Sequence, residues 1–315
     1  MRNFFIFLSL FLSSTLLAQN SSVLAEGRWV KMSLQKAGIY RIDHNTLHKM
    51  GFEPGEINPE NFAIYGHRGG MLPQANDEQY PTDLVELSIQ VLGEEDGVFN
   101  EGDQILFYAD EVDAVDYLSD ENRFQVKKNL YTSTMHFFLT VKQEKGKRLK
   151  RALNLGLNHP LTDYYSEVIH HEEEMRNLLK SGRKWFGELL PNQFSFQITQ
   201  DIQDIKSNGN FRLEINAMSQ AFVNTELDIT LNNQTIGSLS FNPIPNQQYG
   251  LKGDEQSLFF KDNNELFNNS EFELSLTFDA GGSNNARAFL DYFTLDIERE
   301  ARFTEGQQLM RLPIQ

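Results

Sequence analysis

The stretch SGRKWFGE, residues 181–188, lies between a first half of mixed pattern and a second half in which apolar and polar residues alternate. It contains Trp185, one of the two tryptophans of the chain, between Gly182 and Gly187 and among side chains of both charges. Such a stretch is typical of a surface turn with an aromatic anchor, and also of a contact between domains. It therefore predicts a junction between two parts of the chain.

Downstream of this junction, the pattern is that of β-strands. Four runs carry an apolar residue at every second position: Phe211, Leu213 and Ile215; Leu227, Ile229 and Leu231; Phe272, Leu274, Leu276 and Phe278; and Phe293, Leu295 and Ile297. Turn residues such as Asn208-Gly209 and Gly281-Gly282 lie between the runs. Short strands with one apolar face each predict an antiparallel β-sandwich resembling a jelly roll.

Upstream, strand patterns alternate with turns and one helix signal. The runs 27–32 and 36–42 are consistent with a hairpin, and residues 83–91 alternate without interruption, which predicts one half-buried strand. Asp43 is a candidate N-cap for a helix of one or two turns that ends at Gly51. The whole chain is thus expected to be mainly β, with two β-rich domains and a few short helices.

The segment between the two domains has two interpretations. Residues 162–179 carry apolar side chains near helical spacing, which favours an amphipathic helix, but an extended connector fits equally well. His170 and His171 lie in this segment beside three glutamates. Adjacent histidines do not have the spacing of a zinc-binding helix, so a solvated charged face is the better interpretation.

The N-terminus has the pattern of a secretory signal. Arg2 precedes the apolar run 4–17, and Ala18 suits a signal peptidase. The run is too short to span a membrane. We therefore expect export by the Sec route to the periplasm or cell surface of a Gram-negative bacterium, without direct membrane insertion.

These patterns divide the chain into five parts. We expect a signal peptide over 1–18, a β-rich N-terminal domain over 19–160, and a connector over 161–187. A β-sandwich over 188–303 follows, and 304–315 forms the start of a linker or a truncated end.

Composition excludes several functions. The formal net charge of −16 repels phosphate backbones, so we expect no nucleic-acid partner. The chain has no cysteine, and hence no thiol nucleophile and no disulfide, whereas its 25 Phe and 10 Tyr supply ample surface for burial. No serine-hydrolase elbow, zincin motif or nucleotide fingerprint is present, and the Gly-rich stretch 66–70 lacks the ending of a phosphate loop.

One turn has oxygen-bearing side chains near the spacing of a cation loop. Asp96, Asn100 and Asp103 surround two glycines, which suits calcium. The spacing departs from an EF-hand, and the same residues are ordinary in hairpin turns. We expect no cofactor, with calcium at this turn as the alternative.

Three stretches carry a resemblance to a known family. They are the Ser-Gly-Arg-x-Trp-x-Gly-Glu pattern of 181–188, the turn and strand 102–108, and Leu290-Asp291-Tyr292, which Arg299 follows. Together they resemble the N-terminal, non-catalytic region of the PorU family, the sortases of the type IX secretion system, which are gingipain-type cysteine peptidases of Bacteroidota. The resemblance extends from 27–29 to Arg299.

The resemblance implies a division of labour within a longer protein. In the family, a gingipain-like peptidase domain with a His and Cys dyad follows such β-rich domains, removes C-terminal sorting signals from secreted cargo and helps attach the cargo to anionic lipopolysaccharide. This sequence stops at Gln315 without a cysteine, so no catalytic residue is carried over and we expect no enzyme activity from it. The implied partners are that peptidase domain and type IX secretion partners at the outer membrane.

Arg183, Trp185 and Glu188 are our candidates for the contact between domains. The alternative is a stand-alone secreted adhesion or carbohydrate-binding sandwich, for which Trp185 is the single plausible stacking platform.

Overall fold

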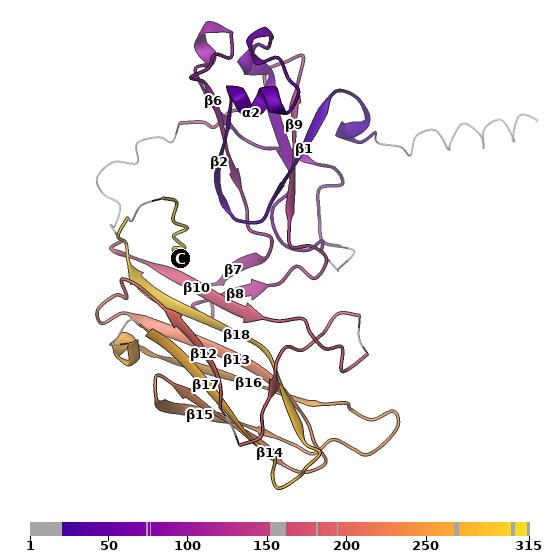
Figure 1. Ribbon diagram of the computed structural model, residues 1–315, viewed down its shortest axis with the longest axis vertical. Coiled ribbons are helices and arrows are strands. Elements are labelled where there is room, and N and C mark those ends of the chain that lie inside the picture. Colours follow the sequence, from indigo (N-terminus) through magenta and orange to yellow (C-terminus); the bar gives the residue numbers. More distant parts are fainter. Residues whose placement is uncertain are drawn as a thin grey trace, which may run out of the picture. The chain divides into compact units, whose positions relative to one another are not determined.

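The computed structural model describes residues 21–73, 75, 77–151, 162–180, 182–193, 195–267, 271–303 and 306–313. The predicted signal peptide and Ser181 lie outside these ranges. The chain forms two compact units, Met1–Val112 with Tyr131–Leu153, and Asp113–Leu130 with Asn154–Gln315. Both units are built mainly of antiparallel strands, which confirms the predicted fold class (Figure 1).

The first unit contains two sheets that share one core. The strand orders are β1-β9-β3-β4 and β2-β6-β5. The bounds are β1 Trp29–Leu34, β2 Gly38–Asp43, β3 Phe62–Gly66, β4 Val85–Glu86, β5 Gln90–Leu92, β6 Gln104–Ala109 and β9 Met135–Val141. Ile64 and Leu139 of one sheet and Ile105 of the other are fully buried in the same apolar cluster. Short 3-10 turns lie at Val23–Ala25, Pro54–Glu56, Pro59–Asn61 and Glu94–Asp96.

The single α-helix among the described residues is α2, His44–Lys49. The Asp43 side chain accepts a hydrogen bond from the Thr46 main-chain N–H at 2.9 Å, as expected of an N-cap. Gly51, which follows the C-cap, has φ +84°, a conformation that favours glycine. The predicted helix and its cap are confirmed.

Two expectations for this unit are wrong. The runs 27–32 and 36–42 form no hairpin, because β1 pairs with β9 and β2 pairs with β6. The run 83–91 is not one strand, since β4 and β5 belong to different sheets. The chain crosses between the sheets at Ile89, which is fully buried. In both cases, strands divided between two sheets bury their apolar faces in one core.

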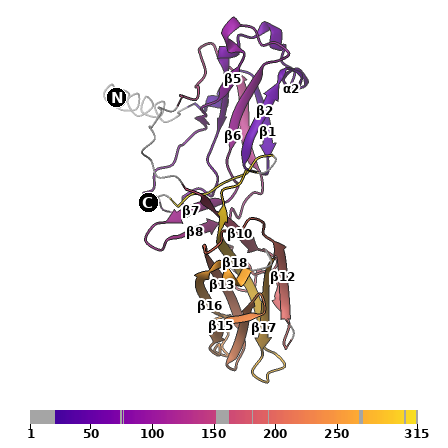
Figure 2. The same ribbon diagram turned by 90° about the vertical axis from the view of Figure 1, so that its left-hand side faces the viewer.

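The second unit is a sandwich of two sheets, which Figure 2 shows as two layers. The strand orders are β10-β18-β13-β16, with β11 also on β18, and β12-β17-β14-β15. The bounds are β10 Tyr164–Glu172, β11 Leu189–Leu190, β12 Ser195–Asp201, β13 Asn210–Gln220, β14 Thr225–Leu231, β15 Gln234–Phe241, β16 Asp254–Asn263, β17 Glu271–Asp279 and β18 Arg287–Glu300, with a 3-10 turn at Asn264–Phe267. The four predicted alternating runs lie on β13, β14, β17 and β18 and supply most of the core.

Two segments differ from the expected organisation. Residues 162–179 are neither a helix nor a plain connector, because β10 pairs with β18 over nine residues. Tyr165 and Ser166 of β10 are 2% and 3% exposed, so this strand is part of the folded unit. The hairpin of β7, Ala114–Leu118, and β8, Arg123–Lys127, belongs to the second unit, although we placed its residues in the N-terminal domain.

Throughout the described ranges, no helix has the length and apolar character needed to cross a membrane.

Candidate functional site

The junction is a loop that folds back on β18. The main-chain N–H of Arg176 donates to the Phe186 carbonyl at 2.9 Å, and the Phe186 N–H donates to the Arg176 carbonyl at 2.9 Å. The Gly187 N–H donates to the Leu290 carbonyl at 2.8 Å. A Cβ at Gly187 would lie 3.1 Å from the Glu173 carbonyl oxygen, which is tighter than ordinary packing. The small residue therefore permits this close approach of two main chains.

Phe186, rather than Trp185, anchors the junction. Its side chain is fully buried and forms a small apolar cluster with Met218 and Phe289. Trp185 is 39% exposed. The sequence pattern located the aromatic anchor, but the buried ring lies one residue further along the chain.

The predicted contact residues do not lie on one surface. Arg183 and Trp185 are exposed, whereas the Glu188 side chain is only 17% exposed. Glu188 Oε1 lies 2.7 Å from His171 Nε2, and Glu188 Oε2 is buried without a hydrogen-bond partner. The His171 ring stacks on Phe293 with 5.4 Å between ring centroids. Glu188 thus fixes the junction to β10, and Arg183 and Trp185 face outward.

Lys184 joins the junction to two strands. Its Nζ lies 2.5 Å from Glu255 Oε2 of β16 and 3.1 Å from Asp291 Oδ2 of β18. Burial raises the pKa of Asp291 to about 6, although the charge of Lys184 opposes this. Burial also opposes the charge on Lys184, but the Glu255 hydrogen bond and the Asp291 charge raise the pKa of the ammonium. Lys184 therefore stays protonated.

Two carboxyl groups near the end of β10, Glu172 and Glu174, affect each other's ionisation. Burial and the neighbouring Glu172 raise the pKa of Glu174 to about 7. Burial opposes ionisation of Glu172 as well, but its hydrogen bond to His170 Nε2, at 3.0 Å, lowers its pKa. His170 Nδ1 lies 2.8 Å from the Thr294 hydroxyl, which holds the ring in place. Glu172 therefore ionises at lower pH than Glu174.

Metal coordination finds no support in the described part of the chain, where no group of three or more His, Cys, Asp or Glu is placed to hold an ion. His170 and His171 are consecutive residues of β10, so their side chains point to opposite faces of the sheet. At the candidate calcium turn, Asn100 Nδ2 donates to Asp96 Oδ2 at 2.8 Å, and the Asn100 N–H donates to Asp103 Oδ2 at 2.7 Å. These carboxylates cap the turn, and calcium binding there stays a prediction.

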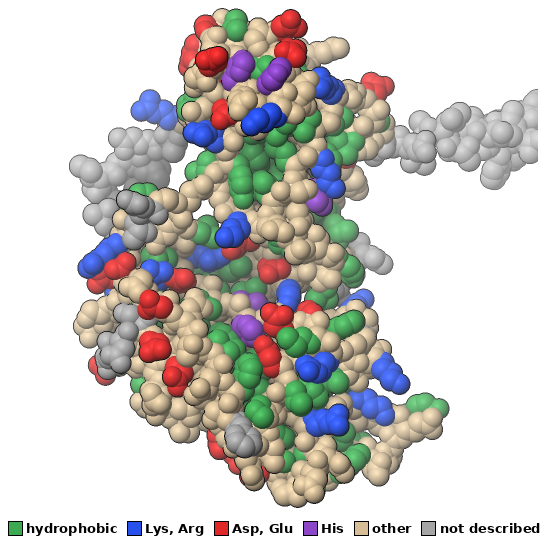
Figure 3. Space-filling model, in the orientation of Figure 1, with side chains coloured by type: hydrophobic (Ala, Val, Ile, Leu, Met, Phe, Trp, Pro, Cys, Tyr) green, Lys and Arg blue, Asp and Glu red, His purple; other side chains and the backbone are tan. Residues whose placement is uncertain are grey.

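The charge of the second unit is unevenly distributed. In the lower part of Figure 3, which is this unit, Lys and Arg gather with hydrophobic side chains towards the right, whereas Asp and Glu are more frequent towards the left. The net charge of −16 is therefore a poor guide to any single surface.

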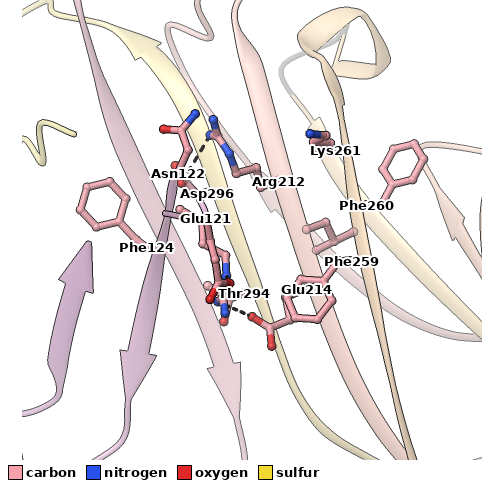
Figure 4. Close-up of a pocket in the computed structure, with 12 residues that line it drawn as sticks. Glu121, Asn122, Phe124, Arg212, Glu214, Phe259, Phe260, Lys261, Thr294 and Asp296 are labelled. Atoms are coloured by element: carbon pink, nitrogen blue, oxygen red, sulfur yellow. Dashed lines mark hydrogen bonds and ion pairs between the residues drawn. The ribbon is translucent and has the colours of Figure 1, made fainter. Parts of the chain in front are cut away.

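A cavity of about 340 Å³ lies between the β7–β8 hairpin and the outer face of the sheet β10-β18-β13-β16 (Figure 4). We call it the hairpin cavity. Residues 121–124 line it from the hairpin, and six outward-facing side chains line it from the sheet: Arg212, Glu214, Phe259, Lys261, Thr294 and Asp296. Polar residues that alternate with apolar ones on a strand are ordinarily in solvent, so no local pattern marks these side chains as the lining of a cavity.

No family model matches the chain, and no curated protein does. Among solved structures, the chain is similar to dimeric latent PorU from Porphyromonas gingivalis, with a TM-score of 0.74 and 21% sequence identity. The match covers 93% of this chain and 26% of that one, so this chain spans about a quarter of the length of that protein. At the level of fold, the comparison confirms the predicted resemblance to an N-terminal region of PorU.

Two other likenesses are much weaker. The CBM36-1 domain of a xylanase from the hindgut metagenome of Trinervitermes trinervoides has 12% identity and a TM-score of 0.28, over 41% of this chain and 95% of that one. A β-porphyranase from Bacteroides plebeius has 8% identity and a TM-score of 0.28, over 88% and 36%. Likenesses with TM-scores this low do not indicate a function for this chain.

Proposed function

We propose that this chain acts as the non-catalytic N-terminal portion of a PorU-like type IX secretion sortase. In that role it packs against and orients a gingipain-like peptidase domain and contacts secretion partners at the outer membrane. The supporting observation is the likeness of fold, which covers almost all of this chain and only a quarter of the PorU chain. The sequence offers no cysteine thiolate, so the peptidase chemistry belongs to another part of the longer protein.

The exposed junction is the proposed contact surface for the peptidase domain. Trp185 and Arg183 sit on a loop that Phe186 and Lys184 hold in place through burial and ion pairs. Glu188 contributes indirectly, because its contact with His171 fixes the end of that loop. A rigid aromatic side chain beside an arginine is typical of the energetically dominant centre of an interface.

The first test is the size of the native protein in its own cells. We expect an antibody raised against the second unit to detect a species of about four times the 36.3 kDa of this chain, because the match covers 26% of PorU. A single band near 36.3 kDa, less a signal peptide, contradicts the proposal. Retention of that smaller species on glycan columns would favour the carbohydrate-binding alternative.

The second test is the substitution Trp185→Ala in the longer protein. After cleavage at a protease site engineered behind Gln315, the two fragments should dissociate at least about tenfold more readily, because an interface tryptophan typically contributes more than ~1.4 kcal/mol. Co-elution in gel filtration measures the effect. Tyr249→Ala is the matched control, since Tyr249 is 92% exposed on another loop. Equal association of the Trp185→Ala and unsubstituted proteins would remove Trp185 from the interface.

A further inference from the structure

The hairpin cavity is lined by two cationic residues on neighbouring strands of the sheet. Arg212 of β13 and Lys261 of β16 are directly opposite in the register of the two strands. Like charges in this position destabilise a sheet. In the described part of the chain, the Lys261 side chain has no hydrogen-bonded or ion-paired partner. The carboxylate nearest to Arg212 is Asp296 Oδ2, at 3.6 Å, which is beyond hydrogen-bonding distance (Figure 4).

The third polar group of the cavity is Asp296, whose carboxylate is hydrogen-bonded to Ser166 and to the Phe124 main chain but has one oxygen without a donor. The Asp296 side chain is 4% exposed, and its Oδ1 is buried without a hydrogen-bond partner. Buried oxygens are normally satisfied by protein, water or ligand. The cavity thus offers an unpaired ammonium group on Lys261, Arg212 donors that the ion pair with Asp296 leaves without a hydrogen bond, and one oxygen of Asp296 without a donor.

An exposed aromatic ring borders these groups. Phe259 is 59% exposed, and the Arg123 guanidinium lies 5.2 Å from its ring centroid. Arg123 is already paired with Glu121 at 2.6 Å and with Glu214 at 2.8 Å. Its side chain therefore lines the cavity, but its charge is not available to bind an anion. Phe259 therefore supplies apolar surface for the carbon atoms of a ligand.

The position of the cavity favours a peptide over other anions. β16 is the last strand of its sheet and, within the described residues, pairs only with β13. β15 of the other sheet lies near β16 but forms no ladder with it. A strand at the end of a sheet can accept an extended peptide along the edge that carries no ladder. Such a peptide combines a carboxylate side chain with main-chain N–H donors, which matches both kinds of unused group.

We propose that the hairpin cavity binds an acidic residue of an extended peptide. The side-chain carboxylate lies between Arg212 and Lys261, a main-chain N–H donates to Asp296 Oδ1, and the aliphatic carbons rest on Phe259. The cavity belongs to the second unit alone and does not require a following peptidase domain. This inference is therefore independent of the proposed function.

The test is an NMR titration of the chain, without its signal peptide, with the peptide acetyl-Gly-Glu-Gly-amide. We expect shift changes at residues 121–124 and 259–261, and at least about tenfold weaker binding of the uncharged acetyl-Gly-Gln-Gly-amide. Lys261→Gln should weaken binding of the acidic peptide by a similar factor. Arg287→Gln, which changes an exposed arginine outside the cavity, should leave binding unchanged.

Several outcomes would overturn the proposal. Equal binding of the two peptides, or undiminished binding to Lys261→Gln, excludes carboxylate recognition. Glucuronate or inorganic phosphate binding more tightly than the acidic peptide excludes a peptide as the occupant. Lys261→Gln also controls for folding: without ligand, its melting temperature should equal or exceed that of the unsubstituted chain, because a like-charge pair is removed.

Discussion

The inner face of the sheet β10-β18-β13-β16 packs into an apolar core, whereas its outer face is buried only in part and there by polar side chains. On the inner face, Phe211, Leu213 and Leu295 are at most 1% exposed and pack into the sandwich core. On the outer face, Thr294 and Asp296 are 6% and 3% exposed, although both are polar. A strict alternation of apolar and polar residues thus does not mean that one face is in water.

This difference changes what each face requires. Apolar burial has no direction, so the inner face depends on volume and shape. The outer face requires partners for each polar group, as where Glu214 accepts from the Tyr292 hydroxyl at 2.6 Å and pairs with Arg123 at 2.8 Å. Loss of one member leaves another buried without a partner. The two faces should therefore respond differently to substitution.

The largest loss of stability is expected for a substitution on the inner face. Phe211→Ala should lower the free energy of unfolding by about 3–5 kcal/mol, because it removes a fully buried ring and leaves a cavity. Urea denaturation measures the loss. Phe259→Ala is the matched control on the outer face, where 59% exposure limits the expected loss to about 1 kcal/mol. If the Phe211→Ala variant does not fold, the Phe211→Leu variant is measured instead, and a smaller decrease in the free energy of unfolding is expected. Equal losses at the two positions would contradict the comparison.

The next effect is expected on the outer face. Arg123→Ala should cost about 2–3 kcal/mol, less than for a fully buried pair, because the side chains of Arg123 and Glu214 retain 13% and 14% exposure. The matched control is Lys127→Ala on the same hairpin, whose pair with Asp116 is more than half exposed. That control should change stability by less than about 0.5 kcal/mol. A cost at Arg123 no greater than at Lys127 would show that the hairpin leaves the outer face solvated.

The inner face could be predicted from the sequence, because burial against one core imposes a period of two. The alternating runs of β13, β14, β17 and β18 and the Asp43 cap are local signals, and the structure confirms them. The pairing partners of β1 and β2 could not be predicted in the same way. β1 pairs with β9 and β2 pairs with β6, and the alternation within a strand does not indicate which distant strand it pairs with.

The burial of polar side chains on the outer face could not be predicted, because the β7–β8 hairpin that covers them lies elsewhere in the chain. The β7–β8 hairpin precedes the sandwich by many residues, and its acidic flanks resemble a solvated loop. The one local signal was the charge pattern of β13: Arg212 and Glu214 are long ionic side chains on a strand buried on its other side. At the junction, glycines and an aromatic residue marked a real anchor, but nothing local distinguished Phe186 from Trp185.

The smallest effect concerns Glu172 and Glu174, the two carboxyl groups near the end of β10. The pKa of Glu174 is raised to about 7 in the folded chain, from an ordinary value of 4.5. The folded state therefore holds a proton that the unfolded state releases between these pH values. The resulting stability is fully present below about pH 4.5 and is lost as the pH rises through 7.

Glu174→Gln should flatten this part of the pH profile. Its melting temperature should fall less between pH 5 and pH 8 than that of the unsubstituted chain, and the remaining slope reflects Asp291, whose pKa is raised to about 6. Glu173→Gln, which changes the exposed neighbour, should leave the profile unchanged. If Glu174→Gln and the unsubstituted chain had the same pH profile, the Glu174 carboxyl would be solvated, and neither burial nor Glu172 would raise its pKa. In that case the cover of the outer face ends at the β7–β8 hairpin and does not extend to the end of β10.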